Sequence, residues 1–368
     1  MALQARRSSR LASPWRLGRR RLSSSRHPHG LAWARMPAPP EPAPPSPAQS
    51  TQSAQLAQSA QITPLAPAVR PRAVADALSA LGTNDLDGIG AGAPVVELEK
   101  LDLGADGVRG AIERQDSAAF ARVAKELGRS WWVALEWGDE DMSGPFWGGS
   151  ANTWRAICEE GRRVWPLMEA GKLIRADGEE VVGASPSGKP RGDRFVVGSD
   201  SRLRDGQGRP TCPTLQALER ALNLLGDLLA APLANEPRVG FKLVARTHSL
   251  FACFPGEGSE YGAHFDGGNG DPRKLTAILY LNEGWQPEDG GELLMYDATR
   301  AEGPCWRSVM PRAGTLVLFR ADRVLHKVSP SYKMRFALTM FFGATYGNDH
   351  KHSKQRNAHL EKLRSLGY

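Results

Sequence analysis

The pattern of apolar residues changes near residue 240, and this change constrains the fold more than any other feature. Before it, apolar residues step by three and four, as on one face of a helix: Leu215, Leu218, Leu222, Leu225 and Leu229. After it, apolar and polar residues alternate in short segments separated by turn residues: KLVARTHSLFACF, KLTAILYL, GELLMY, GTLVLF and RFALTMFF. Helices followed by strands predict a mostly β fold, in which helices buttress one side of a sheet sandwich.

Three further segments have a recognisable local pattern. Apolar residues at nearly helical spacing predict helical structure over 108–127 and a second helix over 154–171. Between 176 and 193 the sequence ADGEEVVGASPSGKPRGD contains Gly, Ser and Pro throughout, which predicts a loop.

Composition divides the chain into five parts. Residues 1–36 are rich in arginine and serine and contain no acid, which is typical of an organellar transit peptide but also of a disordered basic arm. Residues 37–72 are mostly Pro, Ala, Ser and Gln, which predicts a disordered linker. We expect a helical N-terminal extension over 73–124, the main folded domain over 125–348 and a basic tail over 349–368. The leader predicts a plastid or mitochondrial location, with the cytoplasm as the alternative.

The net charge of +7 belongs to the leader. Residues 1–70 contain ten arginines and one acid, whereas the remaining 298 residues contain 37 basic and 39 acidic groups. Nucleic-acid binding needs a basic face on the folded part, so we expect no nucleic-acid partner. No apolar run approaches the ~20 residues of a membrane helix, so we expect no membrane association. Four widely spaced cysteines predict neither a zinc site nor a dense disulfide framework.

One histidine stands two residues before an aspartate in the segment YGAHFD. His264 and Asp266 would point to the same side of a strand. His326, in RVLHKVSP, is the other histidine of a strand-like segment near the candidate site. Two histidines and one carboxylate on one face, with positions left open, form the facial triad that binds Fe(II) in non-haem oxygenases. The open positions would accept a bidentate oxo-acid and O₂.

A bidentate oxo-acid needs a second anchor for its far carboxylate, and RFALTMFF contains one. Arg335 shares a strand face with Ala337, Thr339 and Phe341. A guanidinium on an inward face needs a partner, and it can grip a carboxylate through two hydrogen bonds. In KLTAILYL, the hydroxyl of Tyr280 is placed to reach the same carboxylate.

Taken together, these motifs resemble a known family. The stretch from SLFACFPG to GGELLMY, followed by GTLVLFRADRVLHKVSPSYKMRFALTMFF, is similar to the Fe(II)/2-oxoglutarate-dependent dioxygenases of the prolyl 4-hydroxylase family, and most similar to hypoxia-inducible-factor prolyl hydroxylases and their bacterial and protist relatives. The resemblance implies a double-stranded β-helix, or jelly roll, as the dioxygenase domain over 125–348. It also implies Fe(II), the co-substrates 2-oxoglutarate and O₂, and L-ascorbate.

The resemblance assigns roles to individual residues. His264, Asp266 and His326 would ligate iron and, with Arg335, form the catalytic set. Tyr280, Thr339 and Phe254 would join Arg335 in binding 2-oxoglutarate, with Phe254 standing where close relatives have a tyrosine. Tyr261 would line the substrate entrance, and Phe341 replaces a tryptophan usual in the closest relatives.

The implied reaction is hydroxylation of peptidyl proline at C4, with decarboxylation of 2-oxoglutarate to succinate and CO₂. The partner would be a peptide or protein that contains proline. The loop 176–193 would cover it as a lid, and Arg191 and Asp193 match an Arg-Gly-Asp triplet that ends the corresponding loop of the relatives. Two alternatives stay open: the same chemistry on another residue or a small molecule, or a catalytically silent jelly-roll scaffold.

Overall fold

The computed structural model describes residues 33–35, 88, 90–138, 154–174, 180–183, 192–267 and 271–346. The described elements belong to one compact unit, Ala32–Tyr368. Two antiparallel-rich sheets of ten and five strands dominate this unit, and a two-stranded hairpin lies apart from them.

The larger sheet carries the strand order β3-β4-β15-β12-β17-β10-β8-β5, and β9 and β1 extend it beside β17. Its centre is the pairing of β12 with β17, in which Tyr280 lies opposite Ala337 and Ile278 opposite Thr339. The bounds of its strands are β1 Trp33–Arg35, β3 Lys100–Leu101, β4 Trp132–Glu136, β5 Glu169–Ala170, β8 Arg194–Val197, β9 Phe241–Thr247, β10 Leu250–Phe254, β12 Arg273–Tyr280, β15 Thr315–Arg320 and β17 Arg335–Tyr346.

The smaller sheet has the order β11-β16-β13-β14-β2. Its strands are β2 Val95–Glu97, β11 Ser259–His264, β13 Leu293–Asp297, β14 Cys305–Val309 and β16 His326–Ser331. The separate hairpin pairs β6, Lys172–Ile174, with β7, Glu180–Val182. Side chains from the facing sheets form a common apolar layer that includes Tyr280, Leu293, Met295, Val317 and Phe319.

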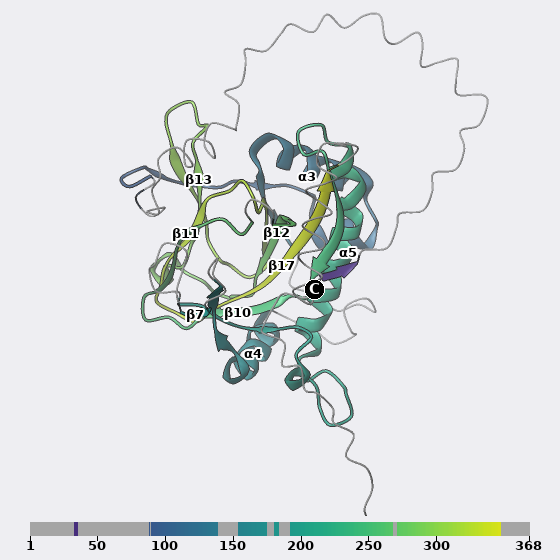
Figure 1. Ribbon diagram of the computed structural model, residues 1–368, viewed down its shortest axis with the longest axis vertical. Coiled ribbons are helices and arrows are strands. Elements are labelled where there is room, and N and C mark those ends of the chain that lie inside the picture. Colours follow the sequence, from purple (N-terminus) through teal and green to yellow (C-terminus); the bar gives the residue numbers. More distant parts are fainter. Residues whose placement is uncertain are drawn as a thin grey trace, which may run out of the picture. The chain divides into compact units, whose positions relative to one another are not determined.

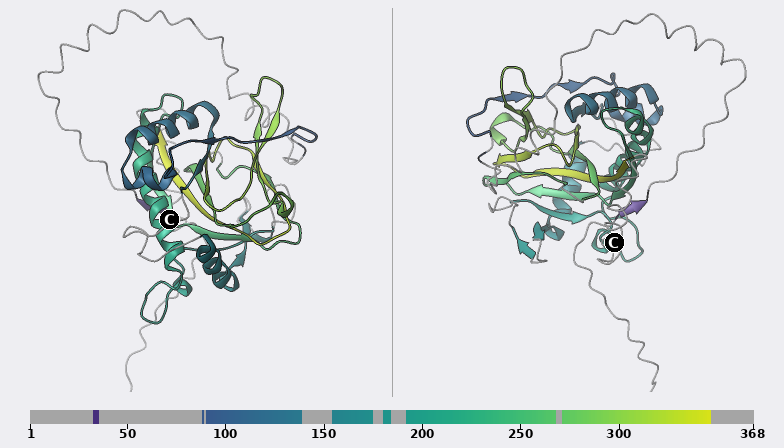
Figure 2. Two further views of the ribbon diagram at one scale, coloured as in Figure 1. Left: turned by 180° about the vertical axis from the view of Figure 1, so that it is seen from behind. Right: turned by 45° about the horizontal axis from the view of Figure 1, so that its top comes forward.

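Helices cover the outer face of the larger sheet, where α3 (Ser117–Ser130) and α5 (Pro213–Asn235) lie together on one side of β17 (Figure 1). The same arrangement is visible from behind (Figure 2). The leucine stripe of α5 is buried against the sheet, and Gly226 allows close approach because a Cβ there would lie 2.2 Å from Phe342. The remaining helical elements among the described residues are α2 Gly107–Glu113, α4 Trp154–Val164 and three short 3₁₀ turns at Trp165–Leu167, Ser201–Leu203 and Pro287–Asp289.

This architecture confirms the predicted fold class, a mostly β jelly roll with helices on one side. The segment 242–254 is divided into β9 and β10 by a break at His248 and Ser249. His248 lies in this break and is separate from the other two histidines of the domain.

Three predictions of local structure were wrong in detail. The helix expected over 154–171 ends at Val164, because Pro166 supplies no N–H and disfavours the helical conformation of the residue before it. The extension expected to be helical over 73–124 contains α2 and the start of α3, but also β2 and β3, which pair with distant strands. The loop expected over 176–193 contains β7, so that this stretch includes one arm of a hairpin.

One short segment of the predicted N-terminal leader is among the described residues. Trp33–Arg35, inside the predicted leader, pairs with β9 at the edge of the larger sheet. The linker, the basic tail and the rest of the leader lie outside the described residues. No helix among those described is long and apolar enough to cross a membrane.

Candidate metal centre

Two histidines and an aspartate converge where β11 and β16 meet. His264 ends β11 and lies directly opposite His326, which begins β16. Asp266 follows on the connection to β12, and its Oδ1 lies 3.5 Å from Nε2 of His264 and 3.7 Å from Nε2 of His326. Within the described residues these three form the one group of His, Cys, Asp or Glu side chains whose donor atoms lie within 4.8 Å of one another. This spacing suits a single metal ion.

Backbone carbonyls set the orientation of both imidazoles. Nδ1 of His264 lies 2.9 Å from the carbonyl oxygen of Gly262, and Nδ1 of His326 lies 3.1 Å from that of Val324. A carbonyl can only accept, so each Nδ1 donates to it, and in the neutral ring each Nε2 keeps a lone pair for a metal ion. Hydrogen bonding of the second ring nitrogen is the usual way in which a protein prepares histidine as a metal ligand.

Electrostatics keeps His326 and Asp266 in ligand-competent protonation states. Burial, together with the neighbouring His264, lowers the pKa of His326 to about 4, while Asp266 opposes both effects. Burial would raise the pKa of Asp266, but the neighbouring His326 and His264 and the charge of Arg273 outweigh this and hold it well below its usual range. A neutral imidazole and an ionised carboxylate at neutral pH are the forms that bind a metal ion.

The two oxygens of Asp266 have different partners. Oδ1 faces the histidines, whereas Oδ2 accepts a hydrogen bond of 2.8 Å from the hydroxyl of Thr276 on β12. This hydrogen bond attaches the segment between β11 and β12, which carries Asp266, to the larger sheet. Thr276 was not singled out as a site residue from the sequence, although it shares the strand face of Tyr280 and this periodicity could have identified it.

A second polar cluster lies on the larger sheet. Arg335 is directly opposite Phe254 in the β10–β17 pairing, and its guanidinium carbon lies 5.0 Å from the Phe254 ring centroid and 4.8 Å from that of Tyr280. Arg335 and Tyr280 are 3% and 0% exposed. Burial lowers the pKa of Arg335, and the nearby Tyr280, Cys253 and Asp193 oppose that shift.

Two polar atoms of this cluster are available to a ligand. Among the described residues, Nε of Arg335 and the hydroxyl of Tyr280 are buried without a hydrogen-bond partner. Buried polar groups are almost always satisfied, and leaving one donor of a charged guanidinium without an acceptor is costly. A carboxylate accepts from both groups at once, so the pair fits the far carboxylate of 2-oxoglutarate.

The remaining predicted residues surround these two clusters. The ring of Tyr261 stacks on that of His264, with centroids 3.9 Å apart and an interplanar angle of 22°. Thr339 lies two positions after Ala337 on the same face of β17. Phe341 is buried beneath Arg273, whose guanidinium carbon lies 5.1 Å from its ring centroid.

The predicted substrate pair is only half described. Asp193 is 6% exposed, and its charge opposes the lowering of the Arg335 pKa by burial. Arg191 lies outside the described residues. Arg273, in contrast, was not predicted to be near the site, and its charge acts on both Asp266 and Tyr261.

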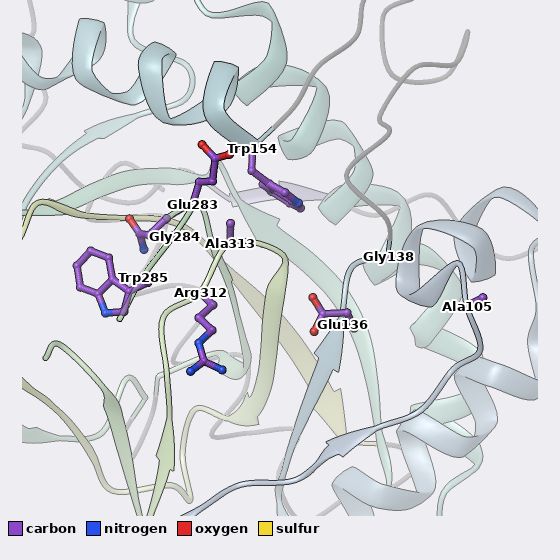
Figure 3. A pocket seen from close by; sticks show the side chains of 10 residues that line it. Ala105, Glu136, Gly138, Trp154, Glu283, Gly284, Trp285, Arg312 and Ala313 are labelled. Carbon is purple, nitrogen blue, oxygen red and sulfur yellow. The ribbon is translucent and has the colours of Figure 1, made fainter. Parts of the chain in front are cut away.

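A pocket of about 360 Å³ lies beyond the other end of β12 (Figure 3). Asn282, Glu283, Gly284 and Trp285 line it directly after that strand, together with Ala105, Glu136, Gly138, Trp154, Arg312 and Ala313. The metal-ligand candidates His264 and Asp266 precede β12, so this pocket is separate from the chemistry assigned to them.

Comparisons with known proteins agree with this geometry. Residues 249–343 match the 2OG-Fe(II) oxygenase superfamily. The chain is 32% identical over 187 residues to human Egl nine homolog 1, covering 50% of this chain and 39% of that protein. It is 38% identical over 100 residues to human prolyl hydroxylase EGLN3, covering 26% of this chain and 40% of that protein.

Among solved structures, the chain is similar to a Pseudomonas putida prolyl-4-hydroxylase, with 28% identity, a TM-score of 0.42 and coverage of 61% of this chain and 98% of that one. It spans at most half the length of the curated Egl nine relatives that it matches. The matched region contains the strands that carry His264, Tyr280, His326 and Arg335. Residues 249–343 thus form a 2OG-Fe(II) oxygenase domain, and the chain is similar over part of its length to proteins named as prolyl hydroxylases.

Proposed function

We propose that this protein is a 2-oxoglutarate-dependent dioxygenase that hydroxylates peptidyl proline at C4, with decarboxylation of 2-oxoglutarate to succinate and CO₂. One observation carries the proposal. A two-histidine, one-carboxylate cluster faces into the same jelly roll as a buried Arg335–Tyr280 pair that lacks a hydrogen-bond partner for Nε and for the hydroxyl. A metal site and a carboxylate anchor in one interior are what a bidentate oxo-acid requires.

Each side chain has a distinct task in this reaction. Nε2 of His264, Nε2 of His326 and Oδ1 of Asp266 would hold Fe(II), and Thr276 keeps the second oxygen of Asp266 engaged. Bound Fe(II) together with 2-oxoglutarate supplies the oxidising chemistry with O₂. Arg335 and Tyr280 would bind the far carboxylate of the oxo-acid. The ring of Phe254 lies beside Arg335, and the ring of Phe319 lies beside His326.

The substrate and the accessory factors belong to the same proposal. The similarity to proteins named as prolyl hydroxylases supports peptidyl proline over lysine or a free metabolite. We expect L-ascorbate to sustain turnover, and we propose that residues 1–36 direct the protein to a plastid or mitochondrion.

The test combines binding with product analysis. Mass spectrometry of proline-containing peptides after incubation with Fe(II), 2-oxoglutarate and O₂ should detect one added oxygen at proline C4. Arg335→Lys should weaken 2-oxoglutarate binding far more than Mn(II) binding, because an ammonium cannot reproduce the guanidinium fork. Tyr280→Phe should weaken it by about 1 kcal/mol, for one lost hydrogen bond.

One outcome would identify a folding defect in the variant, and another would contradict the substrate proposal. Equal losses of Mn(II) and 2-oxoglutarate affinity in Arg335→Lys would show that the variant is misfolded rather than deprived of its anchor. If the added oxygen maps to lysine or to a free metabolite, the substrate proposal is wrong while the dioxygenase chemistry stands.

A further inference from the structure

The two halves of the candidate site lie on different sheets. His264 and His326 belong to β11 and β16 of the smaller sheet, whereas Tyr280 and Arg335 belong to β12 and β17 of the larger one. An oxo-acid that binds both halves at once spans the space between the sheets. The spacing of the sheets therefore determines whether the metal and the carboxylate anchor can share one ligand.

One segment is joined to the edges of both sheets. Residues 90–101, which we term the strap, lie outside the 249–343 superfamily match. Within the strap, β2 pairs in parallel with β14 of the smaller sheet, and β3 pairs in parallel with β4 of the larger sheet. Between them, Leu98 packs against the apolar layer that separates the sheets. In Figure 1 this dark blue segment runs from the side of β13 toward α3.

Trp306 is the anchor of the strap on the smaller sheet. Its backbone N–H donates to the carbonyl of Pro94 at 2.9 Å, and its indole Nε1 donates to the carbonyl of Gly90 at 3.1 Å. The indole is buried in a cluster with Ala263 and Leu325, the residues immediately before the ligands His264 and His326. The strap is thus in contact with the residue that packs behind both ligand strands.

Gly90 packs closely against Trp306 and the neighbouring Tyr296. Its φ is +68°, and a Cβ there would lie 2.7 Å from the ring of Tyr296 and 2.8 Å from Nε1 of Trp306. Gly92, two residues later, has a similar φ of +77°, but no heavy atom lies within 4 Å of the position that its Cβ would take. The two glycines therefore share a backbone requirement and differ only in packing.

Lys100 is the anchor of the strap on the larger sheet. Its ammonium donates to the hydroxyl of Thr315 at 3.0 Å and forms an ion pair with Glu136. Thr315 begins β15, which pairs directly with β12, the strand of Tyr280 and Thr276. The strap thus ends beside β4 and β15, and β15 is the neighbour of β12, which carries Tyr280 of the pair that would bind 2-oxoglutarate.

We propose that the strap is a positioning element that fixes the spacing between the metal-bearing sheet and the sheet that anchors 2-oxoglutarate. The inference rests on the proposed function, because it concerns the ligand that would bridge the two sheets. Its effect should be larger for ligands that contact both sheets than for the metal alone, because two of the three metal ligands, His264 and His326, lie on the smaller sheet and only Asp266 is hydrogen-bonded to the larger one, through Thr276.

The experiment compares Gly90→Ala with Gly92→Ala in the full chain. Three quantities are measured: Mn(II) affinity without oxo-acid, 2-oxoglutarate affinity of the Mn(II)-loaded protein, and the urea midpoint of unfolding. Gly90→Ala should bind 2-oxoglutarate about tenfold more weakly than Gly92→Ala, because small displacements of a positioned ligand are costly. Its Mn(II) affinity should stay within about twofold of the control.

Two further variants keep the test decisive if Gly90→Ala folds poorly. Trp306→Phe removes the indole donor to Gly90 and keeps an aromatic ring, and Lys100→Met removes the contact with Thr315. Both should weaken 2-oxoglutarate more than Mn(II). Equal 2-oxoglutarate affinities in the two glycine variants, or an equal loss of metal and oxo-acid affinity, would overturn the strap proposal. Failure of the unmodified protein to bind 2-oxoglutarate would instead overturn the proposed function.

Discussion

At the scale of single residues, the two carboxylate oxygens of Asp266 have different partners in the candidate metal centre. Oδ2 accepts from the hydroxyl of Thr276, so Oδ1 alone faces the two imidazoles. With Oδ2 engaged by Thr276, Asp266 would hold a metal ion through Oδ1. Loss of the threonine donor would free Oδ2 to rotate toward the metal.

Thr276→Val tests this arrangement because valine keeps the shape of threonine and removes the donor. We expect the variant to lose about tenfold in Mn(II) affinity, the lower end of the range for residues that orient metal ligands. Thr276→Ser keeps a hydroxyl and should remain near the unmodified affinity. Calorimetric titration of Mn(II) would measure both, and an unchanged affinity in Thr276→Val would show that Asp266 does not need this hydrogen bond.

At the scale of elements, a buried charge cluster joins the adjacent ends of β12 and β15. Oδ1 of Asp322 lies 3.0 Å from Nε of Arg320, and Oδ2 lies 3.4 Å from Nζ of Lys274. Burial would raise the pKa of Asp322, but Arg320, Lys274 and Arg323 outweigh it and lower the pKa below its usual value. A depressed carboxylate pKa stabilises the folded state above the ordinary pKa near 4 and stops doing so as pH falls below it.

Asp322→Asn should therefore destabilise the protein in a pH-dependent manner. Near pH 7 we expect a loss of about 2 kcal/mol, because the buried cations lose their carboxylate. The difference from the unmodified protein should shrink as pH falls through about 4 toward the lowered pKa. Urea unfolding at several pH values measures it. Asp205→Asn, which removes a more exposed partner of Arg209, is the control and should change stability little. A pH-independent loss in Asp322→Asn would contradict this account.

At the scale of the whole molecule, the described part of residues 1–72 is the short edge strand β1, and every candidate site residue lies beyond it. A chain that begins at residue 73 retains the strap, both sheets and the helices. We expect it to bind Mn(II) and 2-oxoglutarate within about twofold of the full chain, since an edge strand of three residues adds little to the interior. A larger loss would show that β1 supports the β9–β17 region.

The same boundary tests the location of the protein. A fluorescent fusion of residues 1–72 should enter a plastid or a mitochondrion if the arginine-rich leader is a transit peptide. A fusion in which the arginines of the leader are replaced by glutamine is the control and should stay in the cytosol. Diffuse cytosolic fluorescence of the unmodified fusion would contradict the targeting hypothesis.

The sequence by itself determined the features that depend on local periodicity and on residue chemistry. Alternation in KLTAILYL and RFALTMFF placed Tyr280 and Arg335 on one strand face each, and the leucine stripe of α5 predicted the buttressing helix. The spacing of His264 and Asp266, with His326, indicated a metal site because few side chains bind Fe(II). These inferences need only neighbours along the chain.

The tertiary structure alone decided the features that depend on distant partners. The strands of the strap are too short to be recognised locally, because two or three residues gain their stability from pairing with β14 and β4. The hydrogen bond from Thr276 to Asp266, the placement of Trp306 behind the ligand strands and the burial of Asp193 likewise arise from contacts across the jelly roll. Local sequence specifies which face of a strand is apolar, but the packing of the sheets decides which polar group meets which.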